Sequence, residues 1–279
     1  MRRKAWVCCR HDLRRLASTP RAWAVVILTL LFVENQFAPI REMLVTERFT
    51  LSWPGMTMYL FGDAQATMMA GLGLLLLLFD APFTDETQRY IITRTGRGAW
   101  GCGQVLYVAF VCVLYVVAFS LALLLFQAPW TDWSPGWSGG LNALAKERLY
   151  EVYDTMIEYD PWLMDAYTPL SGMALTLGLH MLAFFVLALV QYVVNVMGGG
   201  RVGFLVAAAP LLVDSVIEEF FDTAAYYFSP VTLARLPALD YGDDMGRPPV
   251  WYAFLVLALL VTALVALSVR LSKRREILL

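Results

Sequence analysis

The sequence has few charged residues. Only 16% of its 279 residues are Asp, Glu, Lys or Arg, whereas 59% are apolar, and the mean hydropathy is +0.60. Soluble proteins contain about 25% charged and roughly 45–50% apolar residues, so this chain has too few charges to cover a water-facing surface. The composition excludes a soluble globular domain and a disordered chain, and it indicates an all-α integral membrane protein that forms a single domain over residues 1–279.

Catalytic and nucleotide-binding motifs are also missing. The chain has two histidines and four cysteines, it contains no Gly-x-Ser-x-Gly sequence, and its run of three glycines at 198–200 is not followed by Lys-Ser or Lys-Thr. These absences exclude a two-histidine metalloprotease helix, a serine hydrolase elbow and a phosphate-binding loop. We therefore expect no enzyme activity, no metal site and no cofactor in this chain, and the absence of a basic arm gives no reason to expect a nucleic-acid partner.

Six apolar runs are long enough to cross a bilayer, because a transmembrane helix needs about 20 predominantly apolar residues. The third run from Val105 to Phe126 and the sixth from Val250 to Val269 contain no charged residue. The first is interrupted by Glu34 and the fifth contains Pro210 and Asp214, so either of these two could be tilted, broken or re-entrant. The predicted spans are residues 22–40, 57–80, 103–126, 171–196, 202–219 and 250–270.

Charge is distributed unequally between the two sides that six spans define. The side that holds both termini has 15 of the 21 Lys and Arg residues, and the opposite side has 18 of the 23 Asp and Glu residues. Basic residues near short loops are retained in the cytoplasm. The pattern therefore predicts that both termini are cytoplasmic, and a shift by one span would destroy the separation of charge.

Two further segments show helical amphipathicity outside the spans. Residues 1–20 combine an apolar stripe with many basic residues, which predicts a helix on the inner membrane surface, either as a topology anchor or as an elbow that frames a lateral gate. In the extracellular segment 127–170, apolar residues recur at helical spacing from Leu141 to Ile157, and the predicted helix ends at Asp160. Its acidic face either attracts a cationic peptide or is simply solvated.

The cytoplasmic loop between the second and third spans, residues 83–98, contains residues typical of the start and the end of a helix. Asp85 is a suitable N-cap, Gly96 is a suitable terminating residue, and the basic residues Arg89, Arg94 and Arg97 lie toward or past the end, where the helix dipole favours positive charge. Isolated helices this short are marginal in water. The predicted helix from about 86 to 95 must therefore pack on the inner ends of the spans or on a cytoplasmic partner.

Polar residues inside the apolar runs are candidates for function because burying them is costly. His180 lies near the middle of the fourth span, and Asp63 and Asp214 lie nearer the outer ends of their spans. Each residue either lines a translocation path or makes a satisfied hydrogen bond between helices.

Together, the basic helix before the first span, the six spans with both ends inside and the loop from Asp80 to Trp100 resemble type 2 permease subunits of bacterial ABC exporters. The resemblance implies a multi-pass protein of the bacterial plasma membrane that contacts lipid, pairs with a second copy or a related permease, and is driven by separate ATPase subunits that bind ATP and Mg. It implies that loop 83–98 is a coupling helix. The residues at the ATPase contact would be Asp85, Arg89, Tyr90, Arg94, Gly96 and Arg97.

Two other classes remain open. A stand-alone secondary transporter or channel would use His180 and Asp63 in ion coupling, and transport driven by a proton gradient without an ATPase would identify it. The other class is a membrane scaffold or sensor that transports nothing. The transported substrate and the symmetry of a dimer are not determined by the sequence, because residues that line a path look like residues that pack.

Overall fold

The protein is all-α apart from two very short strands. The computed structural model describes residues 2–83, 86–155, 157, 159–198, 200–242 and 246–274. The main elements are α1 (Arg2–Ala17), α2 (Pro20–Glu47), β1 (Leu51–Ser52), α3 (Trp53–Gly62), α4 (Ala64–Leu77), α5 (Glu86–Thr95), α6 (Arg97–Gln127), β2 (Thr131–Asp132), α7 (Gly139–Lys146), α8 (Leu149–Val152), α9 (Pro161–Ala166), α10 (Pro169–Gly198), α11 (Gly200–Phe220), η2 (Thr223–Tyr227), η3 (Thr232–Ala234), η4 (Leu236–Ala238) and α12 (Val250–Arg274).

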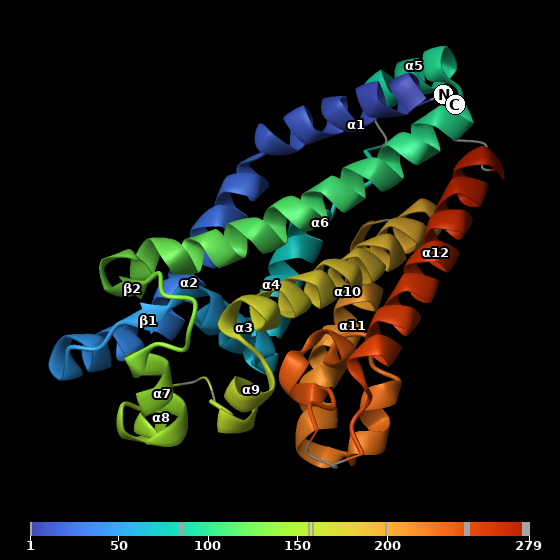
Figure 1. Cartoon of the computed structure of the whole chain (residues 1–279). Helices are drawn as coiled ribbons and strands as arrows, with labels where there is room; N and C mark the ends of the chain where they lie inside the picture. The colour runs from blue at the N-terminus through green and yellow to red at the C-terminus, as the bar shows by residue number, and fades with distance from the viewer. Residues whose placement is uncertain are drawn as a thin grey trace.

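Helix α10 lies at the centre of the bundle. It packs against α3, α6, α11 and α12, while α1 packs along α6 and α4 packs against α11. Figure 1 shows that α1, α5, the start of α6 and the end of α12 lie at one end of the molecule, and that α7, α8 and α9 lie at the other. We call these the α5 end and the α9 end. The basic segments of the sequence thus gather at one end, and the acidic segment 139–166 gathers at the opposite one.

Long apolar helices make the fold compatible with a multi-pass membrane protein. Within the part of the chain that the structure describes, four helices are long and apolar enough to cross a bilayer, namely Pro20–Glu47, Arg97–Trp130, Pro169–Gly198 and Val250–Lys273, and the bent pair α3 and α4 makes up to five. The 25 residues of α12 span about 37 Å at about 1.5 Å per residue, which exceeds the roughly 30 Å hydrocarbon core. Large apolar side chains along α2, α6, α11 and α12 remain exposed, as lipid-facing residues are.

The second span was expected as one continuous run over 57–80, and this expectation is wrong. The run is divided between α3 and α4, whose axes differ by 85°. The break occurs at Asp63, which has an extended backbone (φ −73°, ψ 135°) and caps α4 by accepting the backbone N–H of Ala66 at 2.7 Å. A residue that caps one helix cannot also continue the preceding one, so the apolar run turns there.

The remaining spans differ from their predicted bounds in smaller ways. Helix α2 continues to Glu47, well beyond residue 40, because Glu34 pairs with Arg41 at 2.6 Å inside the helix and the helix passes through Pro39. Helix α11 covers the predicted span 202–219, but it is not among the helices that qualify by length and apolarity. The sixth crossing and the cytoplasmic position of the termini stay predictions.

The expected helix from 141 to 157 is also wrong as a single element. It is replaced by α7 and the short α8, and a further short helix, α9, follows. Arg148 interrupts the run with a left-handed backbone (φ 57°), Asp154 has φ 50°, and Pro161 starts α9. Non-glycine residues seldom adopt positive φ, so amphipathic spacing alone did not reveal these breaks.

Candidate functional site

A buried carboxylate joins three helices at the α5 end. Asp12 of α1 is fully buried and accepts hydrogen bonds from the side-chain amides of Gln88 in α5 at 2.5 Å and Gln104 in α6 at 2.6 Å. The Gln88 carbonyl oxygen in turn accepts the indole N–H of Trp100 at 2.9 Å. We call Asp12, Gln88, Trp100 and Gln104 the anchor network. It fastens the short helix α5 to the bundle and so provides the packing that this helix needs in order to be stable.

Burial raises the pKa of Asp12 above its usual value, although the two amide donors lower it in part. Removal of a carboxylate from water disfavours its charged form, whereas hydrogen bonds donated to it favour that form. The anchor network therefore contains a group whose protonation is sensitive to how tightly α5 and α6 enclose it.

The opposite face of α5 is exposed. Tyr90 is 59% exposed, and the guanidinium of Arg94, also exposed, lies 4.8 Å from the centre of the Tyr90 ring. Gly96 has φ 86° and connects α5 directly to α6, whose first residue is Arg97. Of the other two residues expected at a contact, Asp85 and the side chain of Arg89 lie outside the part of the chain that the structure describes.

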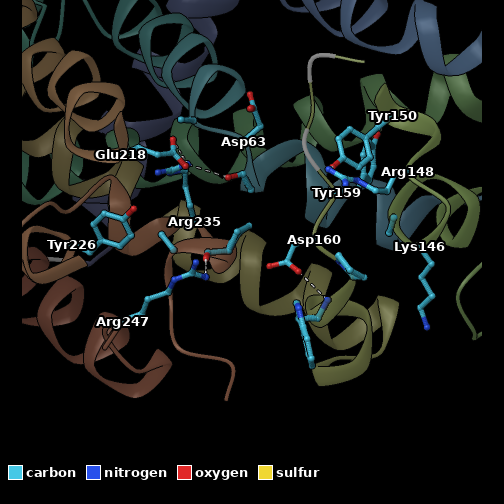
Figure 2. A pocket seen from close by; sticks show the side chains of 17 residues that line it. Asp63, Lys146, Arg148, Tyr150, Tyr159, Asp160, Glu218, Tyr226, Arg235 and Arg247 are labelled. Carbon is cyan, nitrogen blue, oxygen red and sulfur yellow. Dashed lines mark hydrogen bonds and ion pairs between the residues drawn. The ribbon is translucent and has the colours of Figure 1, made fainter. Parts of the chain in front are cut away.

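A polar cavity of about 510 Å³ lies at the α9 end, where the bend between α3 and α4 faces the outer segments. Figure 2 shows Asp63 and Glu218 on one side of this cavity, Asp160 near its middle, and Tyr150 and Lys146 on the other side. Its lining comes from five parts of the chain: the bend, α7 with α8, the start of α9, the end of α11, and the loop before α12. Volumes of roughly 300–1,000 Å³ are typical of small-molecule sites.

Arg235 is the residue at this cavity that the sequence analysis missed. Its side chain is 1% exposed, and its Nε lies 3.1 Å from Oδ2 of Asp214, which is equally buried. Its Nη1 donates to both carboxylate oxygens of Glu218 at 3.0 Å and to the Gly62 carbonyl at 3.4 Å. One guanidinium therefore ties α11 to the bend. A carboxylate within an apolar run requires a partner, and this requirement was the signal that could have indicated a nearby basic residue.

Asp214 itself is held on both sides. Besides the Arg235 ion pair, its Oδ1 accepts a hydrogen bond from the Thr232 hydroxyl. We call Asp214, Glu218, Thr232 and Arg235 the arginine cluster. Although the sequence places Asp214 near the outer end of its span, the residue is buried, because the loop that carries Thr232 and Arg235 covers it.

His180 lies apart from this cavity. It is fully buried in α10, its Nδ1 is 2.8 Å from the Thr176 carbonyl and its Nε2 is 3.1 Å from the Thr67 hydroxyl. The Thr67 hydroxyl also donates to the Phe61 carbonyl at 2.9 Å. Phe61 and Phe184 approach the ring edge-on. Nδ1 has its partner within α10 and Nε2 has its partner in α4, so the geometry favours a hydrogen-bonded packing role for His180 over a path.

The structure thus pairs Asp214 with Arg235, places Asp63 next to Gly62, whose carbonyl accepts from the same arginine, and leaves His180 elsewhere. Among the described residues, no group of three or more His, Cys, Asp or Glu side chains is arranged to hold a metal ion. No family model and no curated protein matches the chain. What the fold defines is an all-α protein with several helices suited to a multi-pass membrane location.

Proposed function

We propose that this chain is the membrane-spanning subunit of an ATP-driven exporter of the type 2 ABC kind, in the bacterial plasma membrane. In this proposal the ATP and Mg are bound by separate cytoplasmic ATPase subunits, and the chain pairs with a second copy or a related permease. One observation carries the proposal: α5 is exposed on one face and fastened by a buried carboxylate to two other helices on the other.

The anchor network lets α5 transmit force. A push on α5 acts through Gln88 on Asp12, and through Asp12 on Gln104, so α1 and α6 move together with it. Hydrogen bonds to a charged group each contribute about 1.5–3 kcal/mol. Sliding of α5 alone would break such bonds inside a buried site, so a joint movement of the three helices costs less.

The exposed face of α5 has the chemistry of a protein contact. Tyr and Arg are enriched at the residues that dominate binding energy in interfaces, and the stacking of Arg94 on Tyr90 holds both side chains in position before a partner arrives. Arg97 adds a cation at the start of α6. The surface is suited to an acidic or aromatic groove on an ATPase.

The test needs a candidate ATPase subunit, to be sought as a neighbouring reading frame that encodes a nucleotide-binding protein without membrane spans, and reconstitutes it with this chain in lipid nanodiscs. The double variant Tyr90→Ala with Arg94→Glu should abolish co-purification and lower coupled ATP turnover at least about tenfold, because both members of the exposed pair are lost. Arg10→Glu is the matched control, since Arg10 is an exposed cation on α1 outside α5. Unchanged binding and turnover in the double variant would refute the role of α5.

A stand-alone secondary transporter is the second candidate, because discontinuous helices with charged groups at the break are typical of such proteins. The bend at Asp63 beside Arg235 is the observation that favours it. Substrate flux into proteoliposomes that contain this chain alone, driven by a proton gradient and abolished by Asp63→Asn, would establish it over the ATPase-driven mechanism.

A further inference from the structure

The cavity at the α9 end is lined by both basic and acidic side chains, but its basic side chains already have partners in the protein. Lys146 is paired with Asp165 at 3.5 Å, Arg148 is paired with Glu151, and Arg235 is paired with two carboxylates. Each of these cations is already compensated by a neighbouring acid. The fourth lining cation, Arg247, donates to the Pro237 carbonyl at 2.7 Å and to the Tyr241 hydroxyl at 2.9 Å. A purely anionic ligand would therefore have to compete with an existing contact at each of the four cations.

Asp160 of the lining accepts hydrogen bonds from the Trp162 backbone N–H and the Tyr241 hydroxyl. Asp63 is the other lining carboxylate that is outside an ion pair. It accepts the Ala66 backbone N–H at 2.7 Å, and among the described residues it forms no ion pair. It borders the cavity at the bend between α3 and α4 (Figure 2). Glu218 is 47% exposed and adds to the negative field on the same side. This side of the cavity is suited to an ammonium group.

Arg235 supplies a second, independent observation. Its Nη2 has no hydrogen-bond partner among the described residues, although the side chain is 99% buried and borders the cavity. A buried guanidinium N–H without an acceptor is unfavourable, because it has lost its hydrogen bond to water and gained none in the protein. Because Asp214 and Glu218 already balance the charge of Arg235, the missing acceptor is best supplied by a neutral oxygen, not by a second anion.

Aromatic side chains complete the lining. Tyr150 and Tyr159 lie with their ring centres 6.2 Å apart on the side opposite Asp63, and Trp162 and Tyr226 also border the cavity. Aromatic faces attract both apolar bodies and ammonium groups. The lining therefore fits a ligand that combines a cationic head with an apolar or aromatic body.

We propose that this cavity binds an organic amine that carries a neutral acceptor oxygen beside its ammonium group, as an amino-acid amide or the amino terminus of a peptide does. Asp63 receives the ammonium group, Arg235 donates to the neighbouring carbonyl oxygen, and the tyrosines contact the side chain. The site is a property of this chain alone and does not depend on an ATPase, so its test is separate from that of the proposed function.

The test measures binding to the purified chain in nanodiscs, without any ATPase, by calorimetric titration to millimolar concentration. Four probes separate the parts of the proposal: phenylalaninamide, N-acetylphenylalaninamide, phenylalanine and phenethylamine. Phenylalaninamide should bind best, acetylation should weaken binding at least about tenfold, and both the carboxylate of phenylalanine and the missing oxygen of phenethylamine should weaken it about fivefold or more. Equal binding of the acetylated probe, or no binding of any probe, would overturn the proposal.

The matching variant is Asp63→Asn, which removes the charge but keeps a side chain that can cap α4. It should lose at least about tenfold in affinity for phenylalaninamide with an unchanged melting temperature. Asp132→Asn is the control, because it makes the same chemical change at the α9 end away from the lining. Full affinity in Asp63→Asn would contradict the assignment of Asp63, as would an equal loss in the control.

Discussion

Replacement of Arg235 by Met offers the sharpest test of the arginine cluster. Arg235 and Asp214 are each 1% exposed, so removal of the guanidinium leaves a carboxylate buried without its counterion. Loss of one partner of a buried ion pair costs about 3–5 kcal/mol, mostly because the remaining charge stays desolvated. Glu218 adds little to this cost because it is 47% exposed and can be solvated.

The effect is measured as the thermal unfolding midpoint of the purified chain in detergent at a fixed heating rate. For a protein of this size, 1 kcal/mol corresponds to about 2–4 °C, so Arg235→Met should lower the midpoint by about 6 °C or more. Combination with Asp214→Asn should recover over half of the loss, since the uncompensated charge is removed while the acceptor for Thr232 is retained. Arg148→Met, which removes an exposed cation, should leave the midpoint unchanged.

Three results would refute this reasoning. If Arg235→Met and the double variant unfold at the same temperature, the cost does not come from the charge of Asp214. If Arg235→Met unfolds within about 2 °C of the unmodified protein, the cluster contributes little to the fold, by the conversion used above. A midpoint in Arg148→Met as low as in Arg235→Met would show that any loss of positive charge at this end has the same effect.

The remaining predictions concern the α5 end. Because burial raises the pKa of Asp12, folding disfavours its charged form, so the free energy of unfolding should fall as pH rises from about 3.9 to the raised folded value and stay level above it. The unfolding midpoint recorded against pH should lose this contribution in Asp12→Asn, and identical pH profiles for the two proteins would contradict it. A Cβ at Gly103 would lie 2.8 Å from the Ala5 carbonyl oxygen, so Gly103→Val should separate α1 from α6 and cost about 1–3 kcal/mol, whereas Gly136→Val meets open space. Equal midpoints for these two glycine variants would rule out close packing of α1 on α6.

The features that the sequence predicted well are those encoded in neighbouring residues. Apolar composition identified a membrane protein, and the long charge-free run in α6 marked a helix that the structure contains. The residues between Asp85 and Gly96 carry cap and dipole signals, and Glu86–Thr95 is helical. The role of that helix in coupling, the number of crossings and the side of the termini stay predictions.

The features that were missed depend on residues far apart in the chain. The bend at Asp63 could not be recognised in the sequence. A carboxylate that caps a helix and a polar residue buried within a span can both have apolar neighbours in the sequence, so the local pattern does not distinguish them. Arg235 is separated from Gly62 by 173 positions, and no local pattern relates the two. In the same way, Gln88 and Asp12 carry no sequence sign that they share a hydrogen bond.

The sequence by itself determined that this chain has several apolar segments suited to a membrane and that its basic and acidic segments are separated, since hydrophobicity and charge add up residue by residue. The tertiary structure decided which polar groups meet: Asp12 with α5 and α6, Asp214 with Arg235, and His180 with Thr67 in place of a cavity. A buried polar group takes whichever partner the packing of distant helices brings within hydrogen-bond distance, and that choice is made only when the helices assemble.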